Sequence, residues 1–150
     1  MKWFVAGEEK VRWSTGIILL ADGDEAVETV RGYLAVGTDY IILHATTAQE
    51  VVSVLSCLRY TVDLLVIDLD LPDETGSGIF GLLTSPGCRC ASKIIVKTSR
   101  QDESFLKQID CLGADAVLLK PTSAEQLVGS VHAVLRGGPN SSVRISGTAA

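Results

Sequence analysis

Five short apolar runs divide the chain at regular intervals. Four of them are nearly continuous in Ile, Val and Leu, which is typical of strands buried on both faces of a sheet. The five runs are Ile17–Ala21, Tyr40–His44, Leu64–Asp68, Ile94–Thr98 and Ala116–Lys120. Between them, apolar residues recur three or four positions apart, a spacing that predicts amphipathic helices. Examples are Val27, Val30 and Leu34, and later Leu127, Val131, Val134 and Leu135.

Capping residues agree with these helix boundaries. Thr47–Glu50 and Ser123–Gln126 have the capping-box spacing, in which a hydroxyl and a carboxylate or amide pair with unpaired N–H groups. Gly113 and Gly137 lie just past helical segments, where a left-handed residue ends a helix. The resulting alternation of strand and helix, five times over, predicts one α/β domain with a doubly wound parallel sheet and helices on both faces. Residues 75–92 are the least regular segment, and there we expect a short helix and a long loop.

Composition narrows the class of protein. A chain of 150 residues with 47% apolar and 21% charged residues predicts one globular domain. The net charge of −5 disfavours direct binding to nucleic acid. No apolar run is long enough to span a bilayer, and Met1–Thr15 lacks the features of a secretory signal, so we expect a cytoplasmic protein without membrane contact. We expect an N-terminal extension over residues 1–15, the domain over 16–136 and a flexible tail over 137–150.

The four cysteines do not favour a metal site. Cys88 and Cys90 form a single C-x-C, whereas a zinc site usually has C-x-x-C pairs or neighbouring histidines. We interpret Cys57 and Cys111 as small core residues of two helices.

Chemistry-bearing side chains follow the predicted strands. Ligand sites in parallel sheets form outside the carboxyl ends of the strands. At those ends lie Asp22 and Asp24, Asp68 and Asp70, Thr98, and Lys120 followed by Pro121. Carboxylates can bind Mg²⁺, while the cation, hydroxyl and ammonium neutralise phosphoryl oxygens. The pattern therefore suits phosphoryl transfer to a carboxylate, with Asp68 as the acceptor.

These residues lie in motifs that resemble the response-regulator receiver family of two-component signalling. The motifs are Leu-Ala-Asp22-Gly-Asp24, Val-Ile-Asp68-Leu-Asp-Leu-Pro72, Ile-Val-Lys-Thr98-Ser99 and Gly113-Ala-Asp-Ala-Val-Leu-Leu-Lys120-Pro121. The resemblance runs from about residue 16 to 136, and it implies a flavodoxin-like sheet with strand order 2-1-3-4-5. It also implies that Asp68 accepts phosphate from a histidine kinase or phosphotransfer protein, that Thr98 and Lys120 contact the phosphoryl group, and that the Lys120–Pro121 bond is cis.

The resemblance further implies a Mg²⁺ cofactor and a signalling surface. We expect Asp22, Asp68 and Asp70 to bind the metal, with Asp24 as an alternative ligand. The face formed by helix 4, strand 5 and helix 5, about Gln101–Arg136, would present the signal to a downstream protein, to an output domain of a longer chain, or to a second copy in a homodimer. The protein would then be a stand-alone receiver or the excised receiver of a longer chain.

Three departures from the family pattern bear on activity. Gly23 stands where the family has a second acid that touches the metal, so we expect weakened Mg²⁺ binding. Val117 replaces the aromatic residue whose rotation reports phosphorylation. Asp73 and Glu74 add negative charge near the acceptor, which disfavours an incoming phosphoryl group.

Alternative interpretations accompany several of these residues. The domain could be a degenerate receiver that binds proteins without phosphorylation. Asp68-Leu-Asp70 also resembles the D-x-D of haloacid-dehalogenase-type phosphatases, but that family places the motif on its first strand, so we do not expect an enzyme. Asp68 could simply cap the turn after its strand. We interpret His44 as structural and consider an Asp70–Arg100 contact across the site.

Overall fold

The computed structural model describes residues 16–23, 26–37, 39–57, 62–71, 91–137 and 145–146. Its strands are β1 (Ile17–Ala21), β2 (Ile41–Ala45), β3 (Val62–Asp68), β4 (Ala91–Thr98), β5 (Ala116–Leu119) and β6 (Ile145–Ser146). Its helices are α1 (Ala26–Gly37), α2 (Ala48–Cys57), α4 (Glu103–Leu112) and α5 (Ala124–Leu135). The five apolar runs therefore match β1 to β5 to within three residues at each end. The helix and loop expected between β3 and β4 fall in residues 72–90, outside the described part of the chain.

All strand pairs in the sheet are parallel, and the strand order is β2-β1-β3-β4-β5-β6. The order 2-1-3-4-5 implied by the resemblance is thus confirmed. The short strand β6 pairs with β5 at the sheet edge, with Val117 opposite Ile145, and this pairing was not predicted. The two residues of β6 belong to the expected C-terminal tail.

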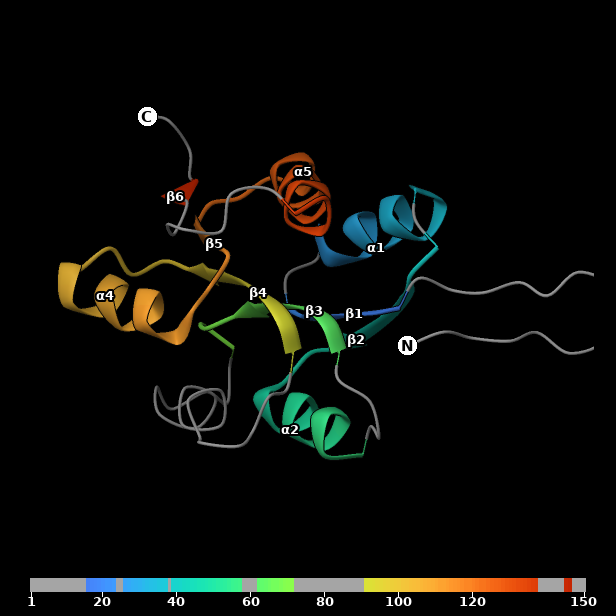
Figure 1. The fold of residues 1–150 in the computed structure, drawn as a ribbon, viewed down its shortest axis with the longest axis horizontal. Coiled ribbons are helices and arrows are strands. Elements are labelled where there is room, and N and C mark those ends of the chain that lie inside the picture. The colour runs from blue at the N-terminus through green and yellow to red at the C-terminus, as the bar shows by residue number, and fades with distance from the viewer. Residues whose placement is uncertain are drawn as a thin grey trace, which may run out of the picture.

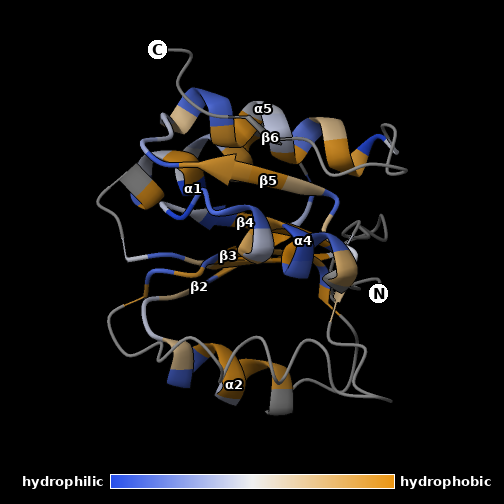
Figure 2. Cartoon of the chain, turned by 90° about the vertical axis from the view of Figure 1, so that its left-hand side faces the viewer, coloured by the Kyte–Doolittle hydropathy of each residue, from blue (hydrophilic) through white to orange (hydrophobic). Residues whose placement is uncertain are grey.

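Helices cover both faces of the sheet (Figure 1). One buried cluster joins the sheet to α2 and α4 and includes Val51, Phe105 and Ile109. The other joins the opposite face to α1 and α5 and includes Val30 and Val131. Figure 2 shows the same three layers, with apolar residues concentrated in the strands between the helices. Such strands lose apolar surface on both sides, which explains their continuous Ile, Val and Leu runs.

Helix ends follow the predicted local chemistry. Ser123 Oγ accepts from Gln126 N while Gln126 Oε1 accepts from Ser123 N, so the capping box of α5 is complete. Before α2, Thr47 Oγ1 accepts from Glu50 N at 3.1 Å. Gly113 ends α4 in the left-handed region, with φ 84°, a conformation that costs glycine little. No described helix is long and apolar enough to cross a membrane.

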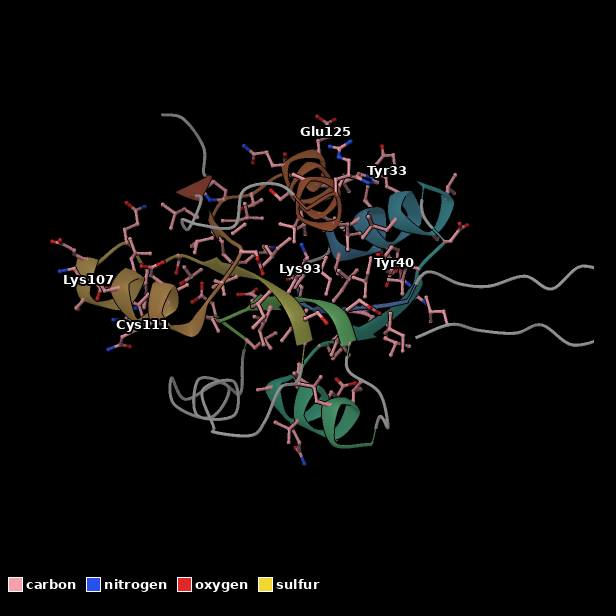
Figure 3. All side chains as sticks on the ribbon, viewed as in Figure 1. Tyr33, Tyr40, Lys93, Lys107, Cys111 and Glu125 are labelled. Atoms are coloured by element: carbon pink, nitrogen blue, oxygen red, sulfur yellow. The ribbon has the colours of Figure 1, made fainter. Side chains whose placement is uncertain are left out.

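The core position expected for Cys111 is wrong. Phe105 and Ile109, four residues apart, form the buried stripe of α4. Cys111 comes two positions after Ile109, about 200° around the helix, and is exposed. Figure 3 labels it on α4. Cys57 lies in α2, but the surroundings of its side chain, like Cys88 and Cys90, fall outside the described part.

Candidate functional site at the carboxyl edge of the sheet

Asp68 is the last residue of β3 and is 5% exposed. Its Oδ2 accepts a hydrogen bond from Lys120 Nζ at 2.7 Å, and its Oδ1 accepts from the backbone N–H of Asp70 at 2.8 Å. The turn-capping role and the pairing with lysine are therefore both present. Burial raises the pKa of Asp68 above its ordinary value, and the negative charge of Asp22 adds to the rise, whereas Lys120 and the Asp70 N–H oppose it.

Lys120 follows β5 and reaches two carboxylates. Besides Asp68, its Nζ lies 3.4 Å from Asp70 Oδ2. Burial by itself would lower the pKa of Lys120, but the hydrogen bond to Asp68 and the charges of Asp68 and Asp70 raise it above its ordinary value. The ammonium is therefore charged at neutral pH. The Lys120–Pro121 bond is cis, as the resemblance implied.

Thr98 ends β4 and is completely buried. It lies one residue past Lys97, the register partner of Asp68 in the β3–β4 pair. The Thr98 Oγ1 accepts from the backbone N–H of Arg100 at 3.1 Å, which leaves its own hydroxyl proton to be donated. Three neighbouring strands thus place Asp68, Thr98 and Lys120 at their carboxyl ends, with Lys120 directly after β5.

Asp70 and Arg100 do not make the contact considered from the sequence. Asp70 Oδ2 accepts from the backbone N–H of Ser99 at 2.9 Å. Arg100 instead donates to Asp102 through Nε and Nη2, and its guanidinium lies 4.0 Å from the centroid of the Phe105 ring.

Asp22 follows β1 and is 1% exposed. Its carboxylate Oδ2 accepts a hydrogen bond from Lys97 Nζ, and the two groups form an ion pair. Lys97 itself is 2% exposed. The backbone carbonyl of Asp22 lies 3.0 Å from His44 Nε2, and since a carbonyl can only accept, this contact assigns a proton to Nε2. This contact is consistent with the structural interpretation of His44 and joins β2 to the end of β1.

The sequence pattern did not indicate a role for Lys97. It lies inside an apolar strand pattern, directly before the threonine, and a single lysine there reads as a surface position. The residues on either side of Lys97 could have indicated its role. Lys97 lies between Val96 and Thr98 in a strand that is buried on both faces, so its ammonium needs a buried partner.

The expected magnesium ligands Asp22, Asp68 and Asp70 lie at the same edge of the sheet, but each already accepts hydrogen bonds from the protein. Asp22 is paired with Lys97, Asp68 is bonded by Lys120 and the Asp70 N–H, and Asp70 is bonded by the Ser99 N–H. No group of three or more His, Cys, Asp or Glu among the described residues could hold a metal ion. Asp24, the alternative ligand, and the acidic pair at 73–74 fall outside those residues. The donor set that the structure describes therefore does not fit a divalent cation.

Residues 17–132 match the response regulator receiver domain family. The chain belongs to this family. It is 28% identical over 120 residues to the oxygen regulatory protein NreC of Staphylococcus carnosus, covering 80% of this chain and 55% of that protein. It is 34% identical over 89 residues to the sensory transduction protein RegX3 of Mycobacterium leprae, covering 59% and 43% of the two chains. The chain thus spans about half the length of these curated relatives.

Solved receiver structures share the fold. A signal receiver domain from Clostridium thermocellum superimposes with a TM-score of 0.66 at 19% identity, covering 81% of this chain and 98% of that one. The chemotaxis response regulator CheY4 of Vibrio cholerae gives a TM-score of 0.64 at 19% identity, covering 81% and 99%. Receiver domains act in signalling, and phosphorylation with Mg²⁺ is a property of the family.

Proposed function

We propose that this receiver accepts a phosphoryl group on Asp68 from the phosphohistidine of a histidine kinase or phosphotransfer protein. The observation that carries the proposal is the buried Asp68 carboxylate held by the Lys120 ammonium at 2.7 Å. A carboxylate oxygen of Asp68 would form a bond to phosphorus as the P–N bond of the phosphohistidine breaks, and the leaving imidazole takes up a proton. Lys120 and the Thr98 hydroxyl would then neutralise the phosphoryl oxygens.

Three features make Asp68 a suitable acceptor. It is close to the edge of the sheet, where a phosphoryl donor can approach, yet few water molecules compete for it because it is 5% exposed. Lys120 is 27% exposed on its side chain, so its ammonium can move from the carboxylate to the incoming group. Asp70 keeps Lys120 nearby through its own carboxylate, 3.4 Å away.

The signal would leave through the face of α4, β5 and α5, toward a downstream protein, an output domain of a longer chain or a second copy. Val117, on β5, is completely buried and has no aromatic ring to rotate. The readout would therefore depend on movement of Thr98, at the end of β4, and Lys120, just after β5. Their backbones are joined because Lys120 N–H donates to the Thr98 carbonyl at 2.9 Å.

Intact mass measurement tests the proposal. The protein is incubated with acetyl phosphate, with Mg²⁺ and separately with EDTA, and we expect a single phosphoryl adduct. Asp68→Asn should abolish the adduct, whereas Asp110→Asn should keep it, because Asp110 is an exposed aspartate of α4 that makes none of the contacts described at the carboxyl edge. An adduct that persists in Asp68→Asn would contradict the assignment of the acceptor.

A second candidate function is a degenerate receiver that binds its partner without phosphorylation. The specific observation in its favour is the Lys97–Asp22 ion pair, which occupies an acid of the family's metal site. No adduct under either condition, together with unchanged partner binding by Asp68→Asn, would favour this candidate.

A further inference from the structure

A buried ion pair joins β1 to β4 at the edge where the acceptor lies. Lys97 and Asp22 are 2% and 1% exposed, and Lys97 Nζ donates to Asp22 Oδ2. A lysine is almost never buried to this extent without a partner, because removing its ammonium from water is costly. The pair is therefore a constitutive part of the folded domain rather than a surface contact that forms and breaks.

The ammonium lies on the same face of the sheet as the acceptor. Lys97 and Asp68 are register partners in neighbouring parallel strands, so their side chains leave the sheet on the same side. Asp22 follows β1, the strand on the other side of β3, so its carboxylate lies at the same carboxyl edge of the sheet as Asp68. Lys97 thus reaches past the β3 terminus to the acid that the family uses for its metal.

Three further carboxylate oxygens at this edge already accept from donors of the protein. The Asp68 oxygens accept from Lys120 and from the Asp70 N–H, and Asp70 Oδ2 accepts from the Ser99 N–H. Gly23 supplies no oxygen from a side chain. Glycine is not required there by packing, because an added Cβ would meet only the Thr46 carbonyl at 3.7 Å, an ordinary van der Waals distance. Packing therefore does not explain why glycine replaces the second acid. The acid is missing in the same domain that has a lysine beside Asp22.

We propose that the Lys97 ammonium takes the place of the divalent cation beside Asp22. It neutralises Asp22 from within the chain, and its positive charge repels Mg²⁺ from the carboxylates that remain. The wild-type domain then does not bind Mg²⁺ at this edge. A second part of the proposal rests on the proposed function: phosphoryl acceptance by Asp68 is then independent of magnesium.

A magnesium titration followed by amide chemical shifts tests the cation binding directly. The wild type and Gly23→Asp, both with Lys97, should show no saturable shifts at the amides of Asp22, residue 23 and Asp68. The double variant Gly23→Asp/Lys97→Met should instead show saturable shifts, with an affinity for Mg²⁺ at least about tenfold above the detection limit set by the wild type. Lys93→Met with Gly23→Asp is the matched control, because Lys93 leaves the same face of β4 about 13 Å earlier along the strand and donates to the Val134 carbonyl of α5. Figure 3 labels Lys93 on β4.

Saturable binding by the wild type, or equal affinity in the wild type and the Lys97→Met double variant, would overturn the proposal. If the Lys97→Met variants do not fold, the wild type and Gly23→Asp still decide it, because binding by Gly23→Asp would show that the lysine does not exclude the ion.

Phosphorylation separates this proposal from the function on which its second part rests. Equal adduct yields with Mg²⁺ and with EDTA support both phosphoryl acceptance by Asp68 and the role of Lys97 in place of the cation. An adduct that requires Mg²⁺ keeps Asp68 as the acceptor and overturns the role of Lys97. An absent adduct in both media counts against phosphoryl acceptance, and the titration then decides the cation site by itself.

Discussion

Removal of the Lys97 ammonium should strongly destabilise the domain. In Lys97→Met the side chain keeps its length and apolar stem, but the Asp22 carboxylate, 1% exposed, loses its cation. Removing one member of a buried ion pair costs about 3 to 5 kcal/mol, because the other charge remains buried without compensation. For a domain of this size, that loss corresponds to a fall of about 6 to 20 °C in Tm.

Urea denaturation followed by circular dichroism measures this loss. Lys93→Met, which removes a half-buried lysine bonded to the Val134 carbonyl at 3.0 Å, should cost about 1 to 2 kcal/mol and serves as the control. The double variant Lys97→Met/Asp22→Asn removes both charges and should recover part of the loss, with an interaction energy of about 1 to 3 kcal/mol. A Lys97→Met variant as stable as Lys93→Met, or strictly additive effects in the double variant, would refute the reasoning.

Two further predictions concern stability. Burial raises the pKa of Asp68 in the folded state, so the folded domain favours the protonated carboxyl. The stability that this protonation contributes is complete below the ordinary pKa of 3.8 and is lost as pH rises through the folded-state pKa. Asp68→Asn should therefore have a higher Tm than the wild type at neutral pH, and the difference should shrink in acid; a less stable variant at neutral pH would contradict this. Ser123→Ala removes the hydroxyl of the α5 capping box and should cost about 0.5 to 2 kcal/mol in urea denaturation, an effect that Ser123→Asp should largely avoid. No loss in Ser123→Ala would mean that the cap does not stabilise α5.

The sequence predicted local structure and the order of the elements well, because those depend on neighbouring residues. Continuous apolar runs identified β1 to β5, and the Ser123–Gln126 spacing located the start of α5. The acceptor candidate and its lysine were also predictable, since parallel strands bring their carboxyl ends to one edge and Asp68 and Lys120 both lie there. Residue type was a weaker guide in α4, where Cys111 was interpreted as a small core residue but is exposed.

Only the tertiary structure decided which charges meet. Lys97 and Asp22 are 75 positions apart, and no local pattern predicts that an ammonium of β4 reaches the acid after β1. The strand register makes Lys97 the partner of Asp68, and burial on both faces of the sheet then leaves the ammonium with Asp22 as its ion-pair partner. The sequence by itself therefore determined a receiver fold with Asp68 and Lys120 at its carboxyl edge. The packing of the sheet determined that the acid expected to hold magnesium is paired with a lysine of the chain.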